Sequence, residues 1–168
     1  SLYKVLDYEH HKPGRGKATI RIKARNMRTG TILEKSFISG YRVEDVRLDY
    51  QQVQYLYHDG ELYHFMNKET YEQPALSAEA VGDNAPYLKE NLDVKLTFYY
   101  GEALDMELPI TVELTVVEAG VSVRGDTATG VTKKVKTETG LEVQVPNFIE
   151  SGDTIRVDTR TGTYVTRV

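Results

Sequence analysis

Short segments of alternating apolar and polar residues, separated by glycine-centred turns, run through almost all of this 168-residue chain. From Ile20 to Arg25 every apolar residue is followed by a cation, and the run from Ile110 to Val117 also alternates. A period of two places successive side chains on opposite faces of a strand. The chain is therefore constrained to fold as small, half-buried β-sheets rather than as a helical bundle.

Turn residues divide this pattern into many short strands. Asp59-Gly60 has the composition of a tight hairpin turn, and Gly101, Gly140, Gly152 and Gly162 end other runs. We predict short helices at residues 77–81 and 86–92, where Pro86 suits a first helical turn. The predicted strands are residues 2–6, 19–25, 31–37, 53–58, 62–67, 72–76, 94–100, 110–117, 132–137, 141–145, 154–158 and 163–168.

The predicted fold class is mainly β, with three small barrels: residues 1–47, 48–108 and 109–168. About five short strands in about 60 residues suit a small closed barrel of the oligonucleotide-binding (OB) type, which we predict for the second and third segments. Because Ser1-Leu2-Tyr3 begins almost inside the first strand and has no starting Met, we expect the natural N-terminus to lie upstream.

The net charge of −4 conceals a separation of charge along the chain. Residues 1–47 carry 11 Lys/Arg and 5 Asp/Glu, a net +6, whereas residues 48–108 carry 3 and 12, a net −9. Residues 109–168 carry 7 and 8, a net −1. We expect a polyanion partner for the first segment, while the acidic second segment must face solvent, protein or a basic surface.

Composition and motifs exclude several function classes. The chain has no Cys, which rules out disulfides and thiolate metal sites and favours a cytoplasmic location. No apolar run approaches the ~18 residues of a membrane span. The nucleophile-elbow, Walker, dinucleotide and zinc-protease motifs are missing from the sequence. We expect no catalytic residue, no cofactor and no metal, since the spacing of His10, His11, His58 and His64 is not that of a metal site.

The segment between the first two predicted strands is a hairpin tip that carries three cations. It consists of Lys12, Pro13, Gly14, Arg15, Gly16 and Lys17. Glycine supplies positive φ at no steric cost, so Arg15 would be held out on a narrow loop. A turn that only reverses the chain does not need such charge; the alternative is a solvated turn whose charge is incidental.

Arg21, Lys23 and Arg25 form the polar face of the second predicted strand. Same-face side chains of a strand lie about 6.8 Å apart, so these cations would form a row suited to a phosphate backbone. The alternative interpretation is an ordinary solvated outer face.

In the order of its parts and in its motifs, the whole chain resembles the bacterial elongation factor P family, relatives of the hypusine-bearing eukaryotic factor. The matching segments are residues 12–17, Arg28-Thr29-Gly30-Thr31, Phe65-Met66-Asn67, Thr70-Tyr71-Glu72-Gln73, Gly125-Asp126-Thr127, residues 145–152 and residues 157–168.

The resemblance implies an L-shaped molecule with an N-terminal KOW/SH3-like barrel and two OB barrels. It implies binding to the 70S ribosome between the peptidyl and exit tRNA sites, and relief of stalling at consecutive prolines. The ribosome would be the catalyst, and residues 12–17 would reach the acceptor end of the peptidyl-tRNA. Gly125, Asp126 and Thr127 would lie near the exit-site codon of the mRNA, with Tyr164 and Arg167 on the small-subunit side. We expect a monomer and no membrane partner.

The tip departs from many family members, which carry a Lys that is extended by a β-lysyl or aminopentanol group. Arg15 cannot take these amine modifications, whereas some members with Arg carry rhamnose on the guanidinium. The modification of Arg15, and with it a modifying enzyme as a partner, stays open. Two other functions compete: an elongation-factor-P-like paralogue, and a generic single-stranded RNA-binding protein of tandem barrels.

Overall fold

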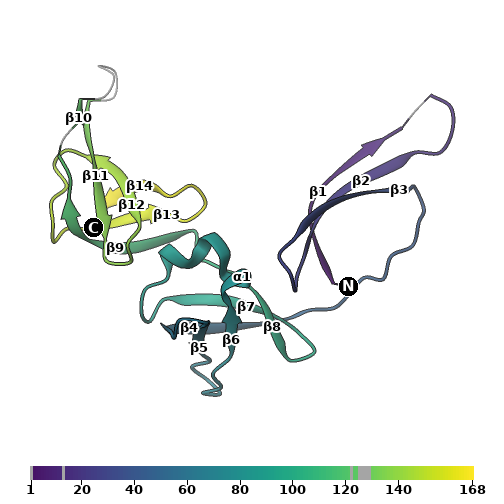
Figure 1. The fold of residues 1–168 in the computed structure, drawn as a ribbon, viewed down its shortest axis with the longest axis horizontal. Coiled ribbons are helices and arrows are strands. Elements are labelled where there is room, and N and C mark those ends of the chain that lie inside the picture. The colour runs from purple at the N-terminus through teal and green to yellow at the C-terminus, as the bar shows by residue number, and fades with distance from the viewer. Residues whose placement is uncertain (1, 13, 122, 125–129) are drawn as a thin grey trace.

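A computed structural model of the chain describes residues 2–12, 14–121, 123–124 and 130–168. The strands gather in three sheets that follow one another along the chain. Figure 1 shows them as an open V, with the middle unit at the vertex and the N-terminal unit forming one arm. The predicted fold class, mainly β with three small units, is confirmed.

The N-terminal unit, which we call the arm, is a three-stranded antiparallel sheet in the order β1-β2-β3. The predicted alternation in the central strand is present: Ala24 is buried, Ile20 and Ile22 are half-buried, and Arg21 and Lys23 are exposed. The arm strands are β1 (Tyr3–His11), β2 (Thr19–Asn26) and β3 (Ile32–Ile38).

The middle unit is a five-stranded sheet in the order β6-β5-β4-β7-β8. Its interior is an apolar cluster that includes Phe65, Leu96 and Leu76, all essentially inaccessible to solvent. The strands are β4 (Asp49–His58), β5 (Leu62–Met66), β6 (Ala75–Ser77), β7 (Asp93–Tyr99) and β8 (Glu102–Glu107).

Helix in the middle unit is limited to one short stretch that follows β6. Ser77 caps α1 (Ala78–Val81) by accepting a hydrogen bond from the Ala80 N–H, and a 3-10 helix, η1 (Gly82–Tyr87), continues it. The predicted helix at 86–92 is wrong, because Leu88 is extended and Asn91 has a φ of 72°. The Asn91 N–H instead donates to the Tyr55 carbonyl, which fastens this segment to β4.

Strand β8 is absent from our sequence prediction, and the predicted strand at 72–76 begins only at Ala75. Alternation is hidden in β8 because Leu104, Asp105 and Met106 are buried in succession. A buried Asp in an apolar run is not a strand signal, although this residue proves central to the arrangement of the units.

The third unit is a six-stranded antiparallel sheet around an apolar cluster that includes Leu114, Ile149 and Ile155. The short β10 is the one strand in it that our prediction did not contain. The strands are β9 (Thr111–Ala119), β10 (Val123–Arg124), β11 (Val131–Thr137), β12 (Glu142–Pro146), β13 (Thr154–Asp158) and β14 (Thr163–Arg167).

The middle and third units meet through apolar packing. Tyr87 and Leu92, which precede β7, pack against the apolar cluster of the third unit. The Thr139 hydroxyl donates to the Pro86 carbonyl across the same junction. The middle and third units therefore share an interface that is largely apolar.

Candidate functional site

The loop between β1 and β2 lies at the end of the arm farthest from the middle unit (Figure 1). The hairpin closes at the pair His11 and Thr19, so the intervening loop extends beyond the last strand pair. Gly16 has a φ of 101°, which favours glycine over any residue with a Cβ. Pro13 lies outside the described residues. The loop is thus a short projection at the tip of a sheet.

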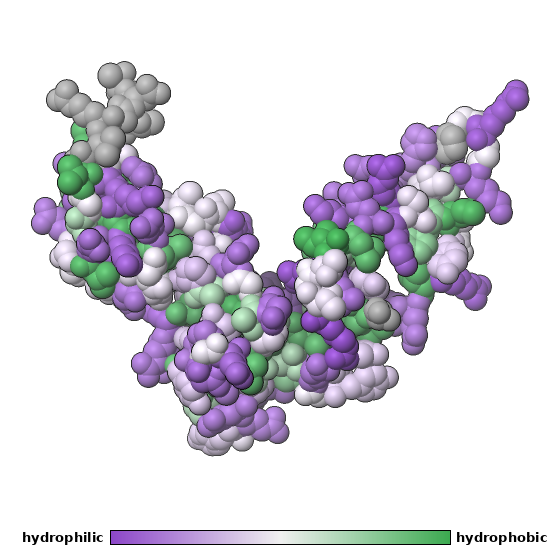
Figure 2. All heavy atoms as spheres, viewed as in Figure 1, coloured by the Kyte–Doolittle hydropathy of each residue, from purple (hydrophilic) through white to green (hydrophobic). Residues whose placement is uncertain are grey.

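Every described residue from position 12 to position 17 is exposed. Arg15 forms no hydrogen bond or ion pair with any residue that the structure describes, and the Cα of Gly14 and of Gly16 face open space. Figure 2 shows hydrophilic residues at the end of the arm. The guanidinium of Arg15 is therefore free to bind an external group.

Positive charge is concentrated at this tip. Between His10 and Ala18 the chain carries Lys12, Arg15 and Lys17 and no Asp or Glu. A narrow projection of one sign of charge attracts anions over several ångströms. The tip can therefore offer several cations to a phosphate-bearing ligand.

The predicted row of cations on β2 is less uniform than the sequence suggests. Arg21 lies opposite Glu9 on β1, and Lys23 lies between Asp7 on β1 and Glu34 on β3. Directly opposed residues of antiparallel strands have Cβ atoms about 4.5–5.5 Å apart. Acidic side chains therefore lie beside both cations, and the attraction of this face for phosphate is weaker than that of the tip.

Arg25, the third cation of the predicted row, turns towards the middle unit. Its Nη2 lies 3.4 Å from the Oδ1 of Asp105 on β8, and Lys4 Nζ lies 3.0 Å from Oδ2 of the same carboxylate. A charge held by an internal carboxylate is less available to an external phosphate. We therefore do not assign Arg25 to an RNA-binding surface.

The candidates on the last strand lie in different environments. Tyr164 is half-buried and packs against the apolar cluster of the third unit, whereas Arg167 is exposed. The guanidinium of Arg167 lies over the ring of Phe148, 5.2 Å from its centroid, and Phe148 is itself 57% exposed. Gly125, Asp126 and Thr127 lie outside the described residues.

Phe148 is a residue that our sequence prediction did not single out. Its exposure in the loop that follows β12, where the neighbouring Ile149 is fully buried, is visible only in the structure. An aromatic ring that holds an arginine side chain in place makes a preorganised contact for RNA or protein.

The turn between β4 and β5 contains a tightly bound carboxylate. The Leu62 N–H, the His64 ring and the Glu61 N–H all bind the side chain of Asp59, and together they hold its pKa well below the usual range. Asp59 is exposed, and its side chain binds groups of its own turn and of the strand that follows. We therefore interpret its role as structural.

Among the described residues, no three His, Cys, Asp or Glu side chains gather as a metal site. Within the same residues, no helix is both long and apolar enough to span a membrane.

Three family models match the chain in succession. Residues 1–43 match the elongation factor P KOW-like domain, residues 48–106 the elongation factor P OB domain, and residues 112–167 the C-terminal domain of elongation factor P. Curated relatives named elongation factor P are similar over nearly the full chain. The protein of Pelotomaculum thermopropionicum is 45% identical over 99% of this chain and 90% of its own length.

This chain belongs to the elongation factor P family. The relative from Synechococcus sp. is 50% identical over 98% of this chain and 89% of its own length, and that from Thermotoga maritima is 50% identical over 99% and 90%. Among solved structures, eukaryotic translation initiation factor 5A from Methanococcus jannaschii is similar, with a TM-score of 0.47 and 21% identity over 63% of this chain and 79% of that one.

The three family models and the names of the relatives identify this protein as a translation elongation factor. The predicted resemblance is therefore confirmed. The names of these relatives favour elongation factor P itself over the two competing functions, a paralogue and a generic RNA-binding protein.

Proposed function

We propose that the chain binds the 70S ribosome between the peptidyl and exit tRNA sites and stimulates peptide-bond formation at consecutive prolines by positioning the peptidyl-tRNA. The observation that carries this proposal is Arg15: an exposed cation without an internal partner among the described residues, flanked by glycines, at the far end of the arm.

The tip has the shape and charge that this role needs. The described loop residues, 12 and 14–18, extend beyond the last strand pair, so the tip can enter a narrow passage from which the three-stranded sheet is excluded. Lys12, Arg15 and Lys17 can each neutralise a phosphate near the acceptor end of a tRNA. We expect Arg15 to reach farthest, because it stands between Gly14 and Gly16 at the centre of the loop.

The ribosome is the catalyst in this proposal, and the factor contributes alignment. Holding two reactants in the reactive geometry can lower a barrier by up to about 7–11 kcal/mol. Proline is a poor partner in peptide-bond formation because its ring restricts the backbone. A cation that orders the acceptor end would lower the entropic cost of reaching the aligned state.

The other units provide attachment. We propose that Tyr164 and Arg167, with Phe148 beneath the guanidinium, face the small subunit, and that Gly125, Asp126 and Thr127 approach the mRNA at the exit-site codon. The proposed location is the cytoplasm, where ribosomes work. The guanidinium of Arg15 can carry rhamnose or no group, and it cannot carry the amine-linked extensions of lysine.

Crosslinking from the tip tests this placement. The chain has no cysteine, so Arg15→Cys provides a single thiol for a photoactivatable crosslinker, and Lys136→Cys on β11 provides a matched site far from the tip. With ribosomes carrying peptidyl-tRNA, position 15 should crosslink to the acceptor end of that tRNA, and position 136 should not. Equal crosslinking of both positions to tRNA would contradict the proposal.

A further inference from the structure

The junction between the arm and the middle unit differs in kind from the junction between the middle and third units. Among the described residues, the ion pairs that join the arm to the middle unit all end on β8. The buried apolar clusters of the middle and third units, with the hydrophobic residues packed against them, contain no residue of the arm. The ion pairs of the arm therefore converge on β8, beside Met27 of the arm and the buried Leu104 of β8, whereas the other two units share a larger apolar cluster.

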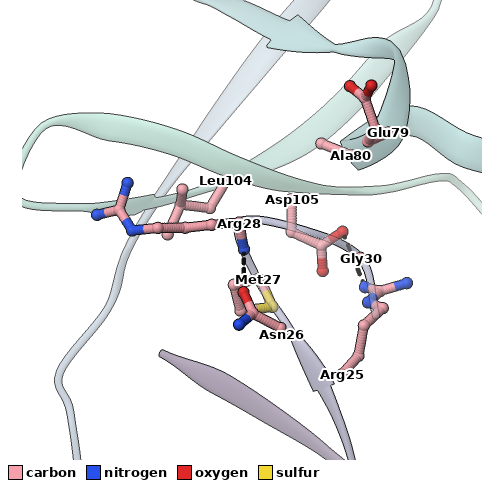
Figure 3. A pocket seen from close by; sticks show the side chains of 9 residues that line it. All are labelled: Arg25, Asn26, Met27, Arg28, Gly30, Glu79, Ala80, Leu104 and Asp105. Atoms are coloured by element: carbon pink, nitrogen blue, oxygen red, sulfur yellow. Dashed lines mark hydrogen bonds and ion pairs between the residues drawn. The ribbon is translucent and has the colours of Figure 1, made fainter. Parts of the chain in front are cut away.

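Asp105 is the centre of this junction. It is 7% exposed, yet its two carboxylate oxygens bind separate strands of the arm: Oδ2 binds Lys4 on β1 and Oδ1 binds Arg25 on β2. A carboxylate held by two strands of a rigid sheet restrains rotation of that sheet as well as its distance. Figure 3 shows Arg25 directed towards the Asp105 carboxylate from the opposite side of the junction.

A second contact lies at the turn between β2 and β3. Nη1 of Arg28 lies 3.0 and 2.8 Å from the two carboxylate oxygens of Glu102 at the start of β8. Both side chains are about half exposed, so this pair is worth less than a buried one. It does, however, add a third point of attachment on the same strand.

The residues at this junction pack closely and leave only a small cavity. The cavity between Arg25, Arg28, Glu79 and Asp105 has a volume of about 10 Å³, room for one water at most. The strong opposite charges of the two segments, +6 for residues 1–47 and −9 for residues 48–108, favour the same docked arrangement. The acidic middle segment thus faces a basic surface of its own chain.

We propose that Asp105 is a positioning residue: by holding Lys4 and Arg25 it fixes the orientation of the arm and hence the place that Arg15 reaches. This inference rests on the proposed function for its consequence in translation, but its structural part can be tested without the ribosome. The arm then behaves as a unit hinged on β8, held by interactions that salt weakens.

Distances between spin labels test the structural part. Ser36→Cys on the arm, Glu61→Cys on the middle unit and Lys136→Cys on the third unit lie at exposed positions of a chain that otherwise has no cysteine. Double electron–electron resonance on the pairs 36–61 and 61–136 reports the two junctions separately. In the wild type we expect a narrow distribution for both pairs at low salt.

Asp105→Asn should broaden the distribution of the 36–61 pair and leave the 61–136 pair unchanged. Raising NaCl to about 1 M, where the Debye length is about 3 Å, should broaden the 36–61 pair of the wild type in the same way. Arg25→Met, which acts from the arm and leaves the fold of the middle unit untouched, should give a similar result. Glu113→Gln, which removes an exposed ion pair with Arg156 in the third unit, is the matched control and should change neither pair.

The consequence in translation is measured on a triproline reporter with the same variants. Asp105→Asn should lower the stimulation by between about 10- and 100-fold, the loss expected when a positioned group is misplaced by about 1 Å. If the wild type gives no stimulation, the proposed function fails, while the distances still decide whether Asp105 holds the arm. An Asp105→Asn protein with the wild-type 36–61 distribution, or with an unchanged triproline rate in an active system, would overturn the inference.

Discussion

The ammonium of Lys4 lies 3.0 Å from the carboxylate of Asp105, although 101 residues separate them in the chain. The contact joins the first strand of the arm to the last strand of the middle unit. The tip around Arg15 lies at the far end of the arm that this contact holds (Figure 1). Such a long-range ion pair orients one sheet relative to the other, and the proposed function depends on this orientation.

Charge at the tip should contribute more to ribosome binding than charge on the outer face of β2. The plot of log K for ribosome binding against log[salt] has a negative slope. Lys12→Gln with Lys17→Gln should reduce the magnitude of this slope by about 2, one for each lost phosphate contact. Arg21→Gln with Lys23→Gln should lower it by less than about 1, because acidic residues lie beside both cations. Titration of labelled protein with ribosomes at several salt concentrations measures both.

Matched controls for this titration are available on the acidic middle unit. Glu72→Gln and Asp83→Asn remove exposed negative charges there and should leave the slope close to that of the wild type. A larger effect from the β2 pair than from the tip pair would show that the row, rather than the tip, carries the phosphate contacts.

Phe148 and Arg167 should act together on the third unit. Arg167→Ala should weaken ribosome binding and lower the salt slope by about 1. Phe148→Ala should weaken binding while leaving the salt slope unchanged, since the ring holds the guanidinium in place and bears no charge. If the ring acts through the guanidinium, the double variant should bind the ribosome as tightly as Arg167→Ala alone. Fully additive losses of binding free energy in the double variant would refute this dependence.

The depressed pKa of Asp59 predicts a pH dependence of stability. Because the pKa is lowered by folding, the ionised carboxylate stabilises the native state above its ordinary pKa of about 4, and this contribution is lost as the pH falls below it. The difference in Tm between the wild type and Asp59→Asn should be constant from about pH 5 to 8 and shrink at lower pH. A difference that grows in acid would contradict the assigned cause.

Substitution of Gly120 should destabilise the protein although this residue is exposed. A Cβ at this position would lie 2.6 Å from the Lys134 carbonyl oxygen, to which the Gly120 N–H also donates. Gly120→Ala should destabilise the third unit by about 1–3 kcal/mol, as expected of overpacking. Gly140→Ala meets open space and should cost only about 1 kcal/mol for its left-handed backbone. Urea denaturation of the two variants compares them, and equal costs would count against the clash.

The sequence predicted most strands and the tip loop because these depend on local signals. Alternation of side chains identified β2 and β9, and Asp59-Gly60 identified the turn between β4 and β5. The helix expected at 86–92 fails because Asn91 binds β4, a tertiary contact that overrides local preference. The local sequence pattern thus predicts where strands form. It predicts less well where contacts with distant strands determine the backbone conformation.

The arrangement of charge was not predictable from the sequence, because it depends on register and on contacts between units. The cations of β2 looked like a uniform row until the pairing placed Glu9, Asp7 and Glu34 beside them. Likewise, nothing in residues 102–107 distinguishes Asp105, which is buried, from the exposed Glu107. The acidic neighbours of the β2 cations and the burial of Asp105 both depend on which strands pair or pack together.

Arg15 should be dispensable for folding and essential for the proposed activity. Because its side chain is exposed and without an internal partner among the described residues, Arg15→Ala should leave the Tm unchanged. Arg15→Lys keeps the charge and loses the planar guanidinium together with any group that it carries, so it should also be impaired.

The most direct test is a reconstituted translation reaction on a triproline reporter, with a proline-free message as the control. The wild type should stimulate synthesis through the prolines, Arg15→Ala should abolish that stimulation, and all proteins should translate the control message equally. Full triproline activity from Arg15→Ala would mean that the loop is an ordinary turn and would contradict the proposed role of the tip.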